Sequence, residues 1–99
     1  MTDFEIKVYK EVMKIKKGEV ATYKDIAIKV GKPKSARAVG NALHKNPDNK
    51  KVPCHRVVNS KGECSGSYAF GGKGVQEKML KSEGIKFKNG KIIIKHGIN

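Results

Sequence analysis

A cysteine, a histidine and an arginine follow one another at Cys54-His55-Arg56, the densest group of chemically reactive side chains in the sequence. A thiol reacts as its thiolate, which a nearby base or cation favours, so the cluster suggests nucleophilic catalysis by Cys54. Sequence adjacency is not geometry, however. Cysteine is also a common small buried residue, and a partly buried His55 could simply hold a carbonyl group. A zinc site is not indicated, because these residues and Cys64 do not form the two close ligand pairs that structural zinc sites use.

The composition is strongly basic. The 99 residues carry 22 Lys and Arg against 9 Asp and Glu, a formal charge of +13 at pH 7. This surplus favours a polyanionic partner, although lysine-rich surfaces also occur in proteins from hot or salty habitats. The first residues lack the pattern of a secretion signal, and the longest aliphatic run, residues 92–94, is too short for a membrane span. We therefore expect one intracellular domain over residues 1–99, with both cysteines as free thiols.

Three helices are predicted ahead of the reactive cluster. Thr2 and Glu5 form a capping box at the start of an apolar stripe that extends from about residue 3 to 17. Thr22 caps a second, shorter helix, and a third is predicted over residues 34–45. Two short helices joined by a turn that contains glycine are typical of a helix-turn-helix and, equally, of an ordinary helical hairpin.

The third helix is expected to expose small side chains around one long one, Arg37. The small residues expected on this face are Ser35, Ala36, Ala38, Gly40 and Ala42. A glycine inside a helix costs about 1 kcal/mol relative to alanine. Gly40 therefore indicates either close packing against a neighbouring helix or close approach to a groove.

The reactive cluster itself is predicted to follow a turn. Residues 46–51 are polar and rich in turn formers, and Val52 is extended because it precedes Pro53. Residues 57–58 are predicted to be a short buried strand or turn. These elements would hold the cysteine in irregular backbone.

The last part of the chain is predicted to contain a helix and a hairpin. The glycine-rich loop at residues 65–74 does not match a phosphate-binding motif, and an apolar pattern from residue 75 marks a helix that ends at residues 83–84. Asn89-Gly90 predicts a two-residue turn within a hairpin at residues 85–94. The expected fold class is mainly α with a small β-hairpin.

Four segments together resemble the O6-alkylguanine-DNA alkyltransferases (methylated-DNA–protein-cysteine methyltransferases). The family's active-site signature, I/V-P-C-H-R-V/I, is matched by Val52-Pro53-Cys54-His55-Arg56-Val57-Val58. Its G-x-V-x-x-Y segment, where the helix-turn-helix starts, is similar to residues 18–23, and its A-R-A-V-G recognition helix is similar to residues 36–40. Asn46-Pro47 stands eight residues before the cysteine, as the family's N-P does. The resemblance covers about residues 4–84 and implies a winged helix-turn-helix-like DNA-binding domain.

The resemblance also implies a chemistry. Cys54 would accept the alkyl group from O6 of guanine and keep it, so each molecule would react once. His55 would draw the thiol proton through a water, and Glu83 would orient His55 and stabilise its charge. Tyr23 would donate a hydrogen bond to N3 of the leaving base, and the backbone carbonyl of Val57 would hold its exocyclic amine. Asn46 would brace the turn that carries the cysteine.

The implied partner is double-stranded DNA, approached from the minor groove. The target atom lies inside a duplex, so the base must be flipped out, and Arg37 would take its place in the stack. Small residues would let the helix approach the narrow groove. The implied DNA-contacting residues are Arg37, Ser35, Ala36, Ala38, Gly40, Asn41 and Arg56. We expect a cytoplasmic monomer that associates with the nucleoid through DNA and needs no cofactor or metal.

The sequence departs from the family pattern in three places. These residues do not include the amino-terminal ribonuclease-like domain of most members, nor the zinc that some members bind there. Asn41 stands where a second glycine is common. The loop over the pocket is about one residue longer than the usual Y-x-G-G loop, and it carries two implied substrate contacts, Tyr68 and the amide of Ala69.

Two other functions remain open at the level of sequence. The Ala69-Phe70-Gly71-Gly72 segment resembles stand-alone alkyltransferase-like proteins, which recognise alkylated bases without transferring the group. Those proteins commonly carry tryptophan in place of the cysteine, whereas this chain has Cys54 and no tryptophan, so the enzyme is favoured. A winged-helix regulator would explain the charge and the hairpin but not the reactive cluster. Cys64, His44 and His96 are expected to be incidental.

Overall fold

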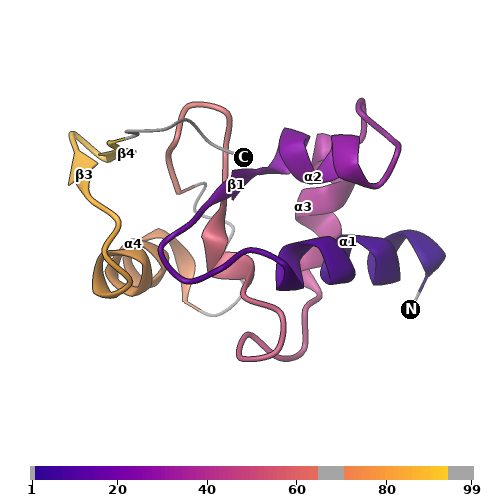
Figure 1. Cartoon of the computed structure of the whole chain (residues 1–99), viewed down its shortest axis with the longest axis horizontal. Coiled ribbons are helices and arrows are strands. Elements are labelled where there is room, and N and C mark those ends of the chain that lie inside the picture. Colours follow the sequence, from indigo (N-terminus) through magenta and orange to yellow (C-terminus); the bar gives the residue numbers. More distant parts are fainter. Residues whose placement is uncertain (1, 65–70, 94–99) are drawn as a thin grey trace.

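The computed structural model describes residues 2–64 and 71–93. The first helices of the chain lie together on one side of the molecule, and the last helix lies with a small hairpin on the other side (Figure 1). In chain order the elements are α1 (Asp3–Met13), β1 (Ala21–Thr22), α2 (Tyr23–Lys29), α3 (Ala36–His44), the 3-10 turn η1 (Cys54–Arg56), β2 (Val57–Val58), α4 (Gly72–Ser82), β3 (Phe87–Lys88) and β4 (Lys91–Ile92). None of the helices in the described residues is both long and apolar enough to cross a membrane.

Capping boxes start the first two helices, as predicted. In α1 the Glu5 amide lies 3.1 Å from Thr2 Oγ1, and the Thr2 amide lies 2.9 Å from Glu5 Oε1. In α2 the Asp25 amide lies 2.9 Å from Thr22 Oγ1, with the reciprocal bond from the Thr22 amide to Asp25 Oδ2 at 3.0 Å. Each pair satisfies two backbone donors that a helix N-terminus leaves unpaired.

The predicted end of the first helix at residue 17 is wrong, because α1 ends at Met13. The amides of Lys14 and Ile15 bond to the carbonyls of Glu11 and Val12, three residues back, which tightens the last turn and lets the chain leave the helix. Ile15 is still buried, with 7% of its surface exposed. The loop after α1 also packs on the core, and this is why the apolar periodicity of the sequence continues past the end of the helix.

The third helix, predicted over residues 34–45, spans Ala36–His44, and one residue expected on its exposed face is buried. Val39, Ala42 and Leu43 of α3 are buried in the core, so the expectation that Ala42 lies on the exposed face is wrong. Arg37, Ala38 and Asn41 are exposed, whereas Ser35, Ala36 and Gly40 are half-buried. Residues 42 and 43 lie three and four positions after residue 39, as an inward helical stripe requires, and α3 packs on both α1 and α2.

A short parallel strand pair joins the helices to the reactive turn. Ala21 of β1 pairs with Val57 of β2, and Thr22 pairs with Val58. The sequence indicated β2 as a strand or turn but did not predict β1, since a strand of two residues is too short to show a period. This pairing fixes the backbone directly after η1 to the backbone directly before α2.

The second half of the described chain is built around α4 and the hairpin. Val20, Val58, Cys64, Leu80 and Ile92 form a small apolar cluster of their own. The Asn89-Gly90 turn is confirmed: both residues have positive φ, 53° and 78°, and Phe87 pairs with Ile92 across the hairpin. The predicted fold class, mainly α with a small β-hairpin and a helix-turn-helix-like arrangement, is confirmed.

Candidate active site

Cys54 lies at the start of a tight turn that neighbouring side chains hold in place. The turn η1 follows Pro53, and only 5% of the Cys54 surface is exposed. Asn46, also buried, donates from Nδ2 to the Val52 carbonyl at 2.8 Å and accepts at Oδ1 from the Asp48 amide at 3.1 Å. These bonds tie the end of α3 to the residue two positions before the cysteine.

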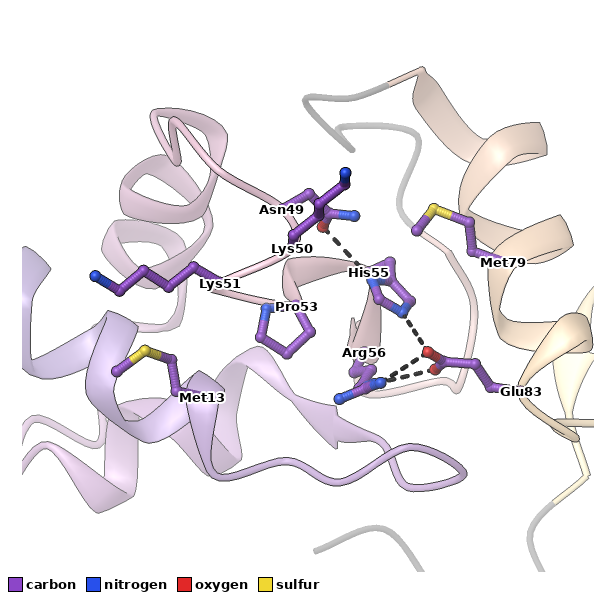
Figure 2. A pocket seen from close by; sticks show the side chains of 9 residues that line it. All are labelled: Met13, Asn49, Lys50, Lys51, Pro53, His55, Arg56, Met79 and Glu83. Carbon is purple, nitrogen blue, oxygen red and sulfur yellow. Dashed lines mark hydrogen bonds and ion pairs between the residues drawn. The ribbon is translucent and has the colours of Figure 1, made fainter.

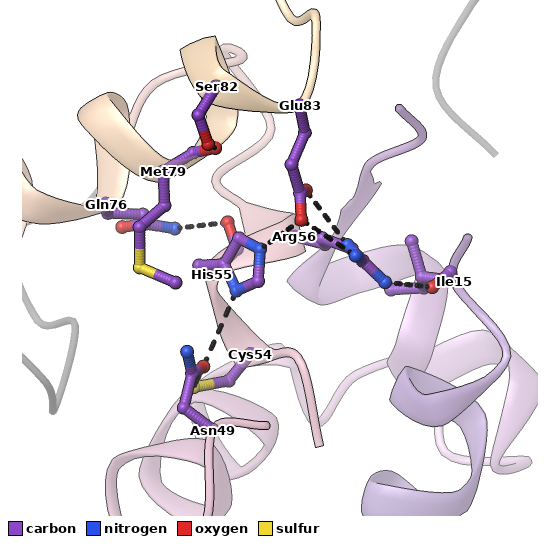
Figure 3. A network of polar contacts seen from close by, with 9 residues as sticks. All are labelled: Ile15, Asn49, Cys54, His55, Arg56, Gln76, Met79, Ser82 and Glu83. Carbon is purple, nitrogen blue, oxygen red and sulfur yellow. Dashed lines mark hydrogen bonds and ion pairs between the residues drawn. The ribbon is translucent and has the colours of Figure 1, made fainter. Parts of the chain in front are cut away.

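One amide oxygen lies between the thiol and the imidazole. Cys54 Sγ is 3.4 Å from Asn49 Oδ1, and His55 Nδ1 is 3.5 Å from the same atom. The other ring nitrogen, His55 Nε2, is 3.1 Å from Glu83 Oε2. Figure 3 shows this path from the cysteine to the C-terminal end of α4. The predicted nucleophile, base and orienting carboxylate are therefore brought together.

Arg56 binds the same Glu83 carboxylate that His55 contacts. Its Nε and Nη2 donate to Glu83 Oε1 and Oε2 at 3.0 and 2.7 Å, and its Nη1 donates to the Ile15 carbonyl at 2.8 Å. The Arg56 hydrogen bonds are the main reason that the pKa of Glu83 lies below its usual value, with His55 contributing in the same direction. An ionised Glu83 can only accept, so Nε2 of His55 carries a proton and Nδ1 of the neutral ring is the basic atom.

This arrangement also bears on the expected DNA contact of Arg56. Its side chain is 16% exposed, and its donors point to Glu83 and to the chain after α1. The residue therefore has a local structural partner on each side. A contact between Arg56 and DNA stays a prediction.

Gln76 is a buried polar residue that the sequence analysis did not single out. It is 1% exposed, and its Nε2 lies 3.1 Å from the His55 carbonyl and 2.9 Å from the Val57 carbonyl. One amide thus holds the middle of the reactive turn and the residue that follows it against α4. The available signal was its helical spacing, because Gln76 lies four positions before the buried Leu80, on the same face of α4.

The two thiols differ in their surroundings. Burial raises the pKa of the Cys54 thiol, and the Asn46 side chain opposes that increase. Burial raises the pKa of Cys64 further, to about 11, and Glu77 adds to the shift. In the described residues no acceptor and base are arranged beside Cys64 as Asn49 and His55 are beside Cys54. That Cys64 is incidental stays a prediction.

A hollow of about 400 Å³ opens beside the imidazole (Figure 2). It is lined by Met13, Asn49, Lys50, Lys51, Pro53, His55, Arg56, Met79 and Glu83. Cys54 is not among the lining residues, so the hollow reaches the base and the carboxylate rather than the sulfur. The described residues include no group of three or more His, Cys, Asp or Glu side chains placed to hold a metal ion.

Except for Arg56, the implied DNA-contacting residues lie on α3 or at its N-cap, Ser35, rather than in this network. Arg37, Ala38 and Asn41 are exposed there. A Cβ added at Gly40 would lie 3.8 Å from Tyr23 Cε1, which is ordinary contact. Packing against α2 therefore does not by itself require glycine at this position.

The remaining predicted pocket residues divide into two groups. Tyr23, the first residue of α2, is half-buried and packs on the apolar cluster that includes Cys54 and Val57. Tyr68 and Ala69 lie outside the described residues. Whether these residues contact a substrate stays a prediction.

The chain matches, over residues 3–85, the family described as 6-O-methylguanine DNA methyltransferase, DNA binding domain. It is 46% identical over 82 residues to the methylated-DNA–protein-cysteine methyltransferase of Methanosarcina barkeri, which covers 83% of this chain and 51% of that protein. It is 52% identical over 85 residues to the protein of the same name from Metallosphaera sedula, covering 86% and 51%. The chain therefore belongs to this family, and it spans about half the length of these curated relatives.

A solved structure of similar size carries the same fold. The structure of S. pombe Atl1 in complex with damaged DNA containing O6-carboxymethylguanine superposes with a TM-score of 0.79 at 40% sequence identity. The match covers 89% of this chain and 82% of that one. Here the two chains correspond over most of their lengths, unlike the match to the longer methyltransferases.

Proposed function

We propose that this chain repairs DNA by transferring an alkyl group from O6 of an alkylated guanine to its own Cys54. The observation that carries the proposal is the connected set of contacts from Cys54 through Asn49 and His55 to Glu83 and Arg56. A thiol beside an oriented base is what nucleophilic cysteine chemistry needs. The matching family and the names of the relatives support the same reaction class.

In the first step the proton on Sγ passes through a water to Nδ1 of His55. Arg56 keeps Glu83 ionised, Glu83 accepts from Nε2–H, and the imidazolium that forms is stabilised by this carboxylate at 3.1 Å. The S–H bond breaks and an N–H bond forms, leaving a thiolate at a buried sulfur. A buried thiolate has lost its hydration, which makes it reactive toward an alkyl carbon held in front of it.

In the second step the thiolate attacks the alkyl carbon. The S–C bond forms as the C–O6 bond breaks, and the electron pair of that bond leaves with guanine. Tyr23 is proposed to donate to N3 of the departing base, and the Val57 carbonyl to hold its exocyclic amine. The Val57 oxygen already accepts from Gln76, and a carbonyl oxygen has a second lone pair for this purpose.

The base would reach the site after leaving the duplex. Arg37 on the exposed face of α3 is proposed to fill the gap in the stack, and the small side chains around it to allow close approach in the minor groove. The formal charge of +13 would supply sequence-independent attraction to phosphates. Damage arises at any sequence, so such attraction suits the search for it.

A second candidate function is lesion binding without transfer. It is favoured by the similarity to S. pombe Atl1, whose chain corresponds to this one over 82% of its length, against about half for the methyltransferases. In that case the protein would mark alkylated guanine for other repair factors. Cys54 would then be a bystander in the binding pocket.

The two functions are separated by intact mass. The protein is incubated with a duplex that contains one O6-methylguanine, beside Cys54→Ala and Cys64→Ala as matched thiol controls. A mass gain of one methylene group, kept in Cys64→Ala and lost in Cys54→Ala, is the result expected of the transferase. Lesion-specific binding with no gain in mass would instead establish the second function.

A further inference from the structure

The acceptor oxygen between thiol and imidazole belongs to Asn49, a residue that neither the resemblance nor the proposed roles assign. Asn49 sits in a turn that other side chains hold firmly. Asp48 Oδ1 accepts from the Lys50 amide at 3.0 Å, and the Val52 amide bonds to the Asp48 carbonyl at 3.0 Å. The backbone that carries the Asn49 side chain is therefore fixed relative to η1.

We propose that Asn49 is a positioning residue whose amide oxygen first accepts the S–H of Cys54 and then the N–H of protonated His55. This inference rests on the proposed function in that it concerns the same thiol and base. In the resting state the neutral ring presents a lone pair at Nδ1, so the thiol is the donor to Oδ1 at 3.4 Å. In that state His55 Nδ1 and Asn49 Oδ1, 3.5 Å apart, are both acceptors, so they form no hydrogen bond with each other.

Proton transfer exchanges the two donors on one acceptor. When the proton moves from Sγ to Nδ1, Oδ1 loses the thiol donor and gains the imidazolium donor at nearly the same distance. A hydrogen bond from a charged donor is stronger than one from a neutral thiol. The exchange therefore favours the thiolate and imidazolium pair over the neutral pair, and it does so without moving the turn.

Other charged and titratable groups of the described residues also lie around the pair. From η1 and the C-terminal end of α4 they are Arg56 and Glu83, from the turn Asp48, Lys50 and Lys51, and from α1 Tyr9. Burial raises the pKa of Tyr9 above its usual value, so its phenol stays neutral in neutral solution. Lysine charges beside the hollow attract a thiolate whatever residue 49 is, so they do not account for an effect of Asn49.

The test is the rate of Cys54 alkylation by iodoacetamide from pH 5.5 to 9, read by peptide mass. Cys64, whose pKa is raised to about 11, serves as the slow reference thiol in the same molecule. Asn49→Ala removes the acceptor, and Asn49→Asp keeps its shape but places a negative charge beside the sulfur. Lys50→Ala, an exposed neighbour in the same turn, is the control for changes to the turn.

We expect Asn49→Ala to react about five-fold more slowly at pH 7, with the midpoint of its pH profile moved upward. Asn49→Asp should move the midpoint further, since a like charge disfavours the thiolate. Lys50→Ala should stay within about two-fold of the wild type, because a single exposed charge has a small effect. Thermal unfolding of each variant shows that the comparison is made between folded proteins.

An Asn49→Ala profile that overlays the wild-type profile overturns the inference, as does a wild-type Cys54 that reacts no faster than Cys64. A loss of thermal stability without a shift of the profile also overturns it, because a structural role alone would give that result. The reagent needs no DNA, so the two proposals fail separately. Shifted profiles in a protein that takes no methyl group from DNA would overturn only the proposed function.

Discussion

The helical half, α1 to α3, and the half formed by α4 and the hairpin contribute differently to the site. Cys54 and Val57 belong to the larger apolar cluster, together with core residues of α1, α2 and α3. The groups that orient His55 and its turn, Glu83 and Gln76, come from α4, whose Leu80 belongs to the smaller cluster. The nucleophile is thus packed by one half and its base is oriented by the other.

In the described residues, side chains of and around the reactive turn provide polar contacts that bridge the two halves. Arg56 bonds to the Ile15 carbonyl after α1 and to Glu83 at the end of α4. Gln76 bonds to two carbonyls of the turn. Folding of the helical half alone would therefore place the sulfur but leave the imidazole without its carboxylate. This contrast yields predictions in which stability and chemistry separate.

The largest effects are expected from one large-to-small change in each cluster. Ile26 and Leu80 are both fully buried, so alanine at either position should lower the free energy of unfolding by about 2–5 kcal/mol. Of the two variants, only Leu80→Ala should also lower the rate of alkyl transfer per folded molecule, because it loosens the helix whose C-terminal end carries Glu83. Urea unfolding and single-turnover rates measure the two quantities. A folded Leu80→Ala protein with the full rate would show that α4 is not needed for the chemistry.

Removal of the Glu83 charge, where the two halves meet, should change the rate of alkyl transfer rather than the affinity for DNA. Glu83→Gln should slow alkyl transfer about 100-fold, the usual scale for general acid–base catalysis. Binding to a duplex with O6-methylguanine should change little, since the binding surface proposed lies on α3. The matched control is Glu77→Gln, which removes a charge from the same helix away from His55. An unchanged single-turnover rate in Glu83→Gln would contradict the role of this carboxylate.

The third prediction concerns the helical half. Arg37→Ala should slow transfer from duplex DNA about ten-fold, because flipping a base out of a stacked duplex costs a few kcal/mol that the arginine would offset in part. The rate on a single-stranded substrate should return to the wild-type value. Lys29→Ala, an exposed cation on α2, is the control for loss of charge. Equal losses on both substrates would assign Arg37 to general DNA attraction instead.

The same contrast explains how far the sequence could predict the molecule. The capping boxes at Thr2 and Thr22 and the Asn89-Gly90 turn were predictable because their contacts join residues one to three positions apart. The β1–β2 pair was not, since Ala21 and Val57 meet only after α2 and α3 have folded between them. Within the site, Cys54 and His55 stood out as a reactive cluster from their residue types, whereas their detailed roles and Glu83 came from the family resemblance.

The two amides at the site show a different limit. Asn49 lies in a run of turn formers, where an asparagine is ordinarily explained by its own backbone preference. Gln76 lies on a helix face whose other inward residue is Leu80, and a polar residue there signals a buried partner without naming it. Their bonding partners lie 5 to 21 positions away in the chain, in the turn η1 and β2. Only the packed structure brings those atoms together.

The smallest effect is expected at Cys64, in the smaller cluster. Its thiol has a pKa raised to about 11, so the folded state holds its proton more tightly than the unfolded chain does. The stability due to this thiol is fully present below the unfolded pKa of about 9 and is lost as the pH rises toward 11. Between pH 8 and 10 the loss should amount to about 1 kcal/mol.

Cys64→Ala should therefore show a shallower decline of unfolding free energy from pH 8 to 10 than the wild type, whatever its stability at pH 7. The change in slope, rather than the absolute stability, is the quantity to compare, because it removes the contribution of lysines and tyrosines common to both proteins. Parallel declines in the two proteins would mean that Cys64 ionises in the folded state as it does in the unfolded chain. The smaller cluster would then be open to water, and α4 would owe its position to Arg56 and Gln76 more than to apolar packing.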